Sequence, residues 1–267
     1  MLTPISHNVN SQNFRANLKS PKLRFGQNDF FINIKGYGKD KTWAKEIIEV
    51  ADTASRMIRK NRDVETVLQS ITLGVAEANS KTSDYSKRVK SGVLRTARLN
   101  WFGGSDKEVY TPYETGRYSC YRELINKVIT SPLKAPDKNL GISYPNGLGD
   151  IKHGKAEKIN YSLDYIFNIF NKKIKPFSDG SATAKDLDKI NDAVAEIRWV
   201  LAHSTPWLRG SDAISNVFMR AIYKSIGVKT YPAKKGVSFD LQAYCTKLSD
   251  YKKDFPTYFT KPPVVIE

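Results

Sequence analysis

The stretch that decides the fold is residues 196–227, which read EIRWVLAHSTPWLRGSDAISNVFMRAIYKSIG. Apolar residues recur at three- and four-residue spacing before the turn and predict a helix over residues 184–203. This stripe consists of Leu187, Ile190, Val194, Ile197 and Leu201. Pro206 and the turn-prone Ser204 end the helix. A second stripe predicts a helix from Ser211 to Gly227: Ile214, Val217, Phe218, Ala221 and Ile222. Two such helices joined by a short loop should pack as a central hairpin.

The connection between these helices carries several chemically useful side chains. Arg209, Gly210 and Ser211 lie at the expected N-terminus of the second helix, where free N–H groups and the helix dipole attract anions. Gly210 lets a ligand approach the backbone, and Arg209 offers a bidentate donor for phosphate or carboxylate. His203, before the loop, is the candidate base towards a ligand held there. Glu196 shares its helix face, seven residues earlier, and is the candidate that orients it.

This region resembles the core of the Fic/Doc superfamily. In order, it contains a helix, a histidine, the pattern Pro-aromatic-x-x-Gly and an amphipathic helix. The superfamily's motif is His-Pro-Phe-x-acidic-Gly-Asn-x-x-Arg, set between two helices. Three positions match its Pro, Phe and Gly: Pro206, Trp207 and Gly210. His203 stands two residues before the family's histidine, whose position is taken by Thr205. Arg209 replaces the metal-binding acid and Ser211 the Asn, and the final Arg is missing. The resemblance covers roughly thirty residues.

The resemblance implies a nucleotidyl or phosphoryl transferase, or a degenerate relative of one, acting as an effector or toxin. It would bind a nucleotide such as ATP at the 203–211 loop through Arg209, Gly210, Ser211 and Trp207. Its substrate would be a protein with an acceptor hydroxyl, whose proton His203 would remove with Glu196 as orienting residue. Only three histidines and two distant cysteines occur, so no metal site is expected.

A non-enzymatic function is the alternative, because the chain carries a net charge of +16 and a pI near 9.6. This excess favours nucleic acid, a nucleotide, an anionic membrane surface or an acidic protein as partner. A helix is predicted from Asp84 to Asn100. On one face it would carry Arg88, Arg95 and Arg98, beside the aromatic Trp101 and Phe102. The alternative function is therefore binding of nucleic acid or an acidic protein partner through these three arginines.

The remaining chain reads as a mainly α, multi-helix domain around the central helix-loop-helix, with one or two minor strands. Residues 1–27 are polar and predicted to be disordered, and residues 28–267 form a single α-helical domain. One strand is expected at residues 30–34, and residues 131–154, rich in Pro and Gly, form a long loop that could cover the site with His153. No secretory signal or membrane-spanning stretch is seen. The protein is expected in the cytoplasm, or exported by a specialised secretion system without a cleaved signal peptide.

Overall fold

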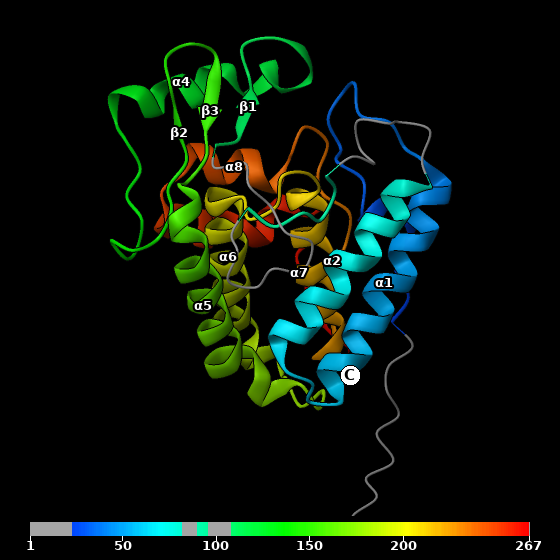
Figure 1. Cartoon of the computed structure of the whole chain (residues 1–267). Helices are drawn as coiled ribbons and strands as arrows, with labels where there is room; N and C mark the ends of the chain where they lie inside the picture. Colours follow the sequence, from blue (N-terminus) through cyan, green and yellow to red (C-terminus); the bar gives the residue numbers. More distant parts are fainter. Residues whose placement is uncertain (1–22, 82–89, 96–107, 267) are drawn as a thin grey trace, which may run out of the picture.

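The computed structural model describes residues 23–81, 90–95 and 108–266, which form eight α-helices and two small antiparallel sheets (Figure 1). The predicted mainly α class with minor strands is confirmed. The helices are α1 (Lys41–Arg59), α2 (Val64–Ser80), α4 (Arg122–Thr130), α5 (Ile159–Ile169), α6 (Leu187–Ser204), α7 (Ser211–Ser225), α8 (Phe239–Cys245) and α9 (Leu248–Asp254). The strands are β1 (Tyr110–Pro112), β2 (Tyr144–Pro145), β3 (Asp150–Lys152), β4 (Val228–Lys229) and β5 (Val264–Val265). Within the described ranges, no helix is long and apolar enough to cross a bilayer.

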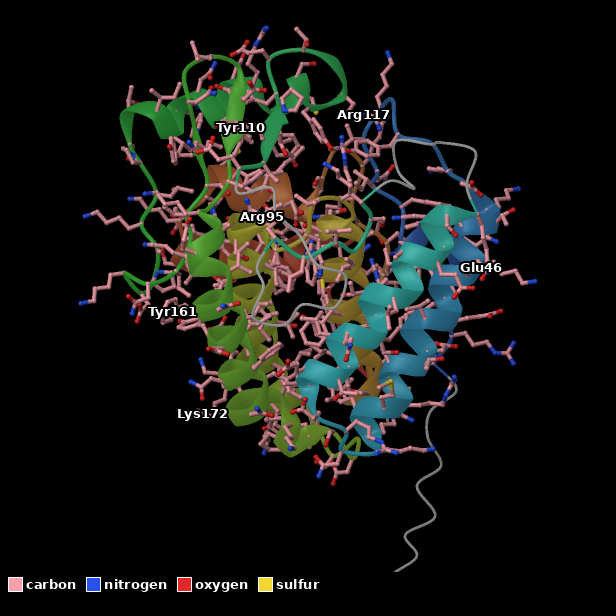
Figure 2. All side chains as sticks on the ribbon, viewed as in Figure 1. Glu46, Arg95, Tyr110, Arg117, Tyr161 and Lys172 are labelled. Atoms are coloured by element: carbon pink, nitrogen blue, oxygen red, sulfur yellow. The ribbon has the colours of Figure 1, made fainter. Side chains whose placement is uncertain are left out.

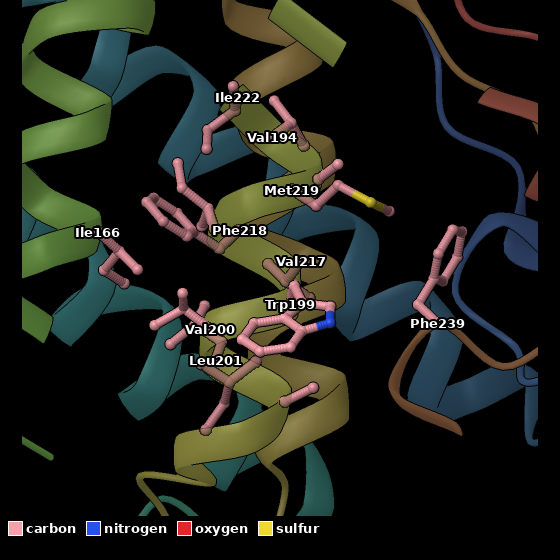
Figure 3. Close-up of a cluster of buried hydrophobic side chains, with 14 of the residues drawn as sticks. Ile166, Val194, Trp199, Val200, Leu201, Val217, Phe218, Met219, Ile222 and Phe239 are labelled. Carbon is pink, nitrogen blue, oxygen red and sulfur yellow. The ribbon is translucent and has the colours of Figure 1, made fainter. Parts of the chain in front are cut away.

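The predicted central hairpin is confirmed: α6 and α7 pack side by side in opposite directions (Figure 1). Their apolar side chains interleave around Val194, Val200 and Phe218 (Figure 3). Nearly every residue of α6 from Ile190 to Ser204 is buried, polar ones included. The reason is that α5, α8 and α9 also pack against α6, so that Asp192 is its one exposed residue over that length. Polar side chains in α6 therefore need partners inside the protein.

The helices α1 and α2 form a second hairpin, which packs against α7. The side chains of Asp40 and Asp63 accept hydrogen bonds from the third backbone N–H of each helix and so cap α1 and α2, as their positions predict. The two helices approach closely where Gly74 of α2 meets Val50 of α1. A Cβ atom at position 74 would lie 2.6 Å from a Val50 methyl group.

The three-stranded sheet stands at one end of the helices, beside α4 (Figure 1). Its strand order is β1-β3-β2, and Ile151 of β3 is fully buried on the inner face. Lys152 pairs with Tyr110 on one side and Tyr144 on the other, which places these three side chains together on the outer face. Residues 131–154 were expected to form a loop without regular structure. Two of the strands lie in this segment, so that expectation is corrected.

The strand predicted at residues 30–34 is absent from the described chain. A 3-10 turn, Gln27–Asp29, precedes this segment, and the adjacent Phe30 and Phe31 are both buried. Adjacent side chains of a strand point to opposite faces, so the alternation in the sequence was misleading here. Residues 23–27 are also described, and Phe25 packs edge-on against Phe30 with ring centroids 5.3 Å apart. Residues 1–22 of the tail predicted over residues 1–27 lie outside the described chain.

The helix predicted from Asp84 to Asn100 is described only over residues 90–95, where the chain is not helical. Instead, Leu94 and Ser91 form isolated β-bridges with Trp207 and Arg209. Arg88 and Arg98 lie outside the described residues. The short segment 90–95 therefore runs along the loop between α6 and α7, and it fixes the position of that loop.

Candidate functional site

The loop between α6 and α7 is held at both ends by unusual backbone conformations. Thr205 ends α6 with a φ of 41°, and Gly210 precedes α7 with a φ of 86°. Between them the loop exchanges backbone hydrogen bonds with residues 90–95: Arg95 N–H donates to Pro206 O, Leu208 N–H to Val93 O, and Gly92 N–H to Arg209 O. This pairing makes the loop a rigid platform at the start of α7.

Arg95 is buried beneath this platform and does not lie on an exposed basic face. Its guanidinium donates to the carbonyl oxygens of Gly154, Ser204 and Thr205 at 2.7, 2.7 and 2.8 Å. Two of these carbonyls belong to the C-terminal end of α6, where a cation is favourable. Burial lowers the pKa of Arg95 to about 10, which leaves it charged at neutral pH. The predicted use of Arg95 to contact nucleic acid is corrected, because its side chain has only 3% exposure.

His203 is enclosed, and both ring nitrogens are used inside the protein. Ser143 N–H donates to Nδ1 at 3.0 Å, so Nε2 carries the proton and donates to Ala243 O at 3.1 Å. Burial lowers the pKa of His203 to about 3. The ring is therefore neutral with no free lone pair, and this geometry argues against the predicted role of catalytic base.

Two residues of the 131–154 segment, Ser143 and Gly154, hold His203 through hydrogen bonds. Gly154 N–H donates to His203 O at 3.0 Å, and a Cβ atom at position 154 would lie 2.9 Å from that oxygen. The Ser143 hydroxyl donates to the same oxygen and therefore accepts from His153 Nδ1, 2.9 Å away. Burial, with the nearby charge of Arg95, lowers the pKa of His153 to about 3. The two histidines thus join the sheet to α6 as neutral structural groups.

Glu196 lies two turns before His203 on the same helix, about 10 Å away along the axis. Its carboxylate accepts a hydrogen bond from the Tyr165 hydroxyl at 2.6 Å and pairs with Lys252 at 3.1 Å. Burial raises the pKa of Glu196, but these two partners outweigh it and the net shift is downward. The expected contact between Glu196 and His203 is not formed, because the carboxylate is committed to α5 and α9.

The other predicted residues remain together at the start of α7. Arg209 is exposed, whereas Trp207 is fully buried and acts as a core side chain. The Ser211 hydroxyl donates to Trp207 O at 3.0 Å and so closes the turn. The first hydrogen bond within the helix runs from Ile214 N–H to Gly210 O. The N–H groups of residues 211–213 therefore have no acceptor within the helix. In the predicted anion site, the donors that remain for a ligand are Arg209, which is exposed, and these N–H groups.

A second polar cluster, which the sequence did not reveal, lies against the same helix end. Arg198 of α6 is 1% exposed and donates to Asp212 Oδ1 at 2.9 Å and Asp240 Oδ1 at 2.8 Å. The carboxyl groups of Asp212 and Asp240 also hydrogen-bond to each other. Burial, and then the neighbouring Asp212, raise the pKa of Asp240 far above its usual range. One cation thus faces two carboxyl groups, and burial disfavours the ionised form of Asp240.

The signal for this cluster was a charged residue inside the apolar run of α6. An arginine between Ile197 and Trp199 must find a partner when all sides of the helix are packed. A second buried arginine, Arg220 of α7, is paired in a similar way with Asp29 at 3.6 Å. Burial lowers the pKa of Arg220 to about 10.

A small polar pocket lies between these two arginine clusters. Its walls include Asp29, Phe31, Asp212, Asn216, Ser238 and Phe239, and it has room for little more than a water molecule. The rings of Tyr37 and Tyr118 pack edge-to-face with centroids 5.9 Å apart, and the exposed Arg117 lies over the Tyr37 ring; Arg117 is labelled in Figure 2. In the described residues, no group of three or more His, Cys, Asp or Glu side chains could hold a metal ion.

Comparison with known protein families gives a result different from the sequence resemblance. The family model that matches is AvrB_AvrC, described as avirulence protein, over residues 129–262. No curated protein matches the chain. The matched residues include α6, the loop and α7, the region that resembled Fic/Doc, so this match overturns that resemblance. The motif similarity rested on three residues of a short loop, whereas the family model spans half of the 267 residues. The chain belongs to the AvrB/AvrC family of avirulence proteins.

Proposed function

We propose that this avirulence protein binds a phosphate-bearing ligand of the nucleotide class, such as ADP or ATP, at the start of α7, and that it acts on a host protein. The observation that carries the proposal is the exposed guanidinium of Arg209 beside Gly210 at the head of α7. The helix has 15 residues, long enough for a developed dipole at its N-terminus. A phosphate there would receive backbone N–H groups and a charge-assisted contact from Arg209.

The turn into α7 also bears on a ligand at this position. Gly210 has a φ of 86°, which other residues rarely adopt, and a Cβ atom there would lie 3.2 Å from the Ser91 hydroxyl, so the glycine is required by the turn itself. The Asp212 carboxylate in that turn is paired with Arg198, which offsets its repulsion of an anion.

Isothermal titration calorimetry with ADP, ATP and inorganic phosphate tests the proposal. Arg209→Ala should weaken binding by about 1.5–3 kcal/mol, the usual worth of a hydrogen bond to a charged group. Thermal stability should stay the same, because Arg209 is exposed. Arg62→Ala is the matched control: it removes another exposed arginine, in the turn between α1 and α2, and should leave the affinity unchanged.

Two results would contradict this proposal. One is the absence of binding of all three ligands to the wild type at high protein concentration. The other is equal loss of affinity in the Arg209 and Arg62 variants, which would indicate only a non-specific effect of net charge.

We also propose that the protein is exported to the host by a specialised secretion system, because the family consists of avirulence proteins. The polar residues 1–22 are the segment to test, since their Ser and Asn content suits an export signal that is not cleaved. Deleting them from a translocation-reporter fusion should abolish delivery into host cells while leaving expression in the bacterium intact. Unchanged delivery of the deleted fusion would refute this part of the proposal.

A further inference from the structure

Two segments that follow different helices, residues 228–239 and 255–266, run side by side in opposite directions. Strand β4 in the first segment pairs with β5 in the second, and backbone hydrogen bonds continue this pairing as far as Lys234 and Tyr258, whose N and O atoms are 2.9 Å apart. The two segments contain four lysines and no Asp or Glu. We call this paired surface the lysine strip; its lysines, all exposed, are Lys229, Lys234, Lys235 and Lys261.

Two lysines of the strip converge on one aromatic ring. The Nζ atom of Lys229 lies 5.3 Å from the centroid of the Tyr231 ring, and that of Lys261 lies 5.9 Å from the same point. Lys229 belongs to the first segment and Lys261 to the second, so the pairing of the segments brings the two charges together. Both lysines are exposed and Tyr231 is half-buried, so the ammonium groups stay open to a partner that approaches from solvent.

A buried arginine fixes the backbone beneath this ring. Arg220 of α7 donates to Tyr231 O at 3.1 Å and to the Thr230 hydroxyl at 2.9 Å. The place of the ring, and with it the direction of both lysine side chains, is therefore set from inside the protein. A binding surface that is held in place before its partner arrives loses less conformational entropy on binding.

The lysines of the strip have no ion-pair partner among the described residues. Lysines elsewhere in those residues do pair with carboxylates, as Lys152 does with Glu108 at 2.6 Å and Lys224 with Asp52 at 2.6 Å. Like charges that are held near one ring repel each other, and an anion between them relieves this repulsion. The strip therefore lacks a counter-charge that a partner with carboxylates would supply.

The shape of the strip favours a protein segment over a lipid surface. Helices that lie on membranes insert a row of large apolar side chains, whereas the exposed large apolar side chain of the strip is Val264, opposite Lys229. An extended acidic segment needs carboxylates that meet the ammonium groups and a small apolar contact between them, and the strip offers both. Most of the strip lies inside the region that matches the avirulence family, residues 129–262, which fits a host protein as the source of the segment.

We propose that the lysine strip binds an Asp- or Glu-rich segment of a host protein, with carboxylates seated between Lys229 and Lys261. This surface is separate from the one that the proposed function uses. Lys229 follows the C-terminal end of α7, whereas Arg209 precedes its N-terminal end, and a helix of 15 residues is about 22 Å long. The strip recruits the partner protein and takes no part in holding the phosphate-bearing ligand.

Fluorescence anisotropy of a fluorescein-labelled oligoglutamate peptide, titrated with the full chain at low salt, tests the proposal. Lys229→Gln with Lys261→Gln should weaken binding at least about fivefold, because two charge-assisted contacts are lost. Lys229→Arg with Lys261→Arg keeps both charges and should retain the affinity. The matched control is Lys127→Gln with Lys134→Gln, which removes the same charge at two exposed positions in and after α4. It should weaken binding less than about twofold.

Three results would overturn the proposal. The first is no binding of the peptide to the wild type at low salt. The second is equal weakening in the Lys229/Lys261 and Lys127/Lys134 variants, which would reduce the effect to net charge. The third is binding to vesicles that contain phosphatidylserine, sensitive to Lys229 and Lys261, without binding of the peptide; it would assign the strip to a membrane. No nucleotide is present in these titrations, so they decide the role of the strip whether or not Arg209 binds ADP.

Discussion

At Arg198 one buried positive charge faces two carboxyl groups, and burial raises the pKa of one of them, Asp240. Because the pKa of Asp240 is raised in the folded state, the folded protein holds a proton that the unfolded chain releases above its ordinary value of 3.8. Stability from this group is therefore present below that value and falls as pH rises above it. The loss can reach about 1.4 kcal/mol per pH unit.

Asp240→Asn should remove this dependence, because an amide keeps an acceptor for Arg198 and has no proton to lose. Urea unfolding of wild type and variant at about pH 5 and about pH 7 checks the prediction. The wild type should lose more of its unfolding free energy than the variant between these two conditions. Arg198→Met should instead destabilise by about 3–5 kcal/mol at neutral pH, because it leaves the carboxyl groups without their cation. A parallel pH dependence in wild type and Asp240→Asn would show that Asp240 is ionised in the folded protein.

The two buried histidines have the opposite effect on stability: they lower it as the pH falls. Burial lowers the pKa of both His153 and His203 from 6.5 to about 3. Between these values the unfolded chain binds protons that the folded protein excludes, so stability is complete above 6.5 and is lost as pH falls. Each histidine contributes a slope of up to about 1.4 kcal/mol per pH unit.

Substituting the histidines tests this origin of acid sensitivity. His153→Gln and His203→Gln should each make the loss of stability between about pH 6 and about pH 4 shallower, even if each lowers stability at neutral pH. Circular dichroism during urea unfolding at several pH values measures the slope. The third histidine, His7, lies outside the described residues, and a slope unchanged in both variants would assign acid sensitivity to other groups.

At the scale of elements, side-chain periodicity predicted the central helices closely. The prediction for residues 184–203 matches α6 (Leu187–Ser204) closely, and the caps at Asp40 and Asp63 were readable from their residue types. The same reasoning failed at residues 30–34 because Phe30 and Phe31 are both buried in an irregular segment. It also could not find the partners of Arg198, since Asp212 and Asp240 are 14 and 42 residues away and only the fold brings them together.

The candidate site was predicted only in part, because local sequence rules do not reveal contacts between residues far apart in the chain. Helix and glycine rules placed Arg209 and Gly210 at the head of α7, because those rules depend on neighbours in the sequence. The burial of His203 depends on residues 143 and 243, which no local pattern connects to it. A histidine near a loop therefore looked accessible in the sequence, although the sheet segment and α8 enclose it.

The close contact between α1 and α2 gives a prediction at this scale. Gly74→Ala would ordinarily stabilise a helix interior by about 1 kcal/mol. Here the new Cβ atom would meet both methyl groups of Val50, at 2.6 and 2.9 Å, and a β-branched side chain cannot easily turn away. We expect a net destabilisation of about 1–3 kcal/mol from overpacking. Val50→Ala should rescue the variant, and a double-mutant cycle by urea unfolding measures the coupling; additive effects would show that the helices separate freely.

At the scale of the whole molecule, the net charge of +16 governs the response to salt. Asp212 and Asp240 at Arg198, and Asp29 at Arg220, are paired with buried arginines, so these carboxyl groups do not offset the excess of surface lysines, which repel one another. Salt screens this repulsion over about 10 Å at 0.1 M ionic strength. The melting temperature should therefore rise when NaCl increases from about 0.02 M to about 0.5 M, whereas breaking surface ion pairs alone would lower it.

A charge-reduced variant separates this screening from other effects of salt. Lys234 and Lys235 are both exposed, and Lys234→Glu with Lys235→Glu lowers the net charge by four, from +16 to +12. The variant should melt at a higher temperature than the wild type in low salt and show a smaller gain on adding NaCl, because less repulsion remains to be screened. Differential scanning calorimetry across the salt series, with sucrose as an uncharged control, measures both quantities. If both proteins gained the same melting temperature from NaCl, the rise would come from ion binding or from solvent exclusion, since neither depends on these two lysines.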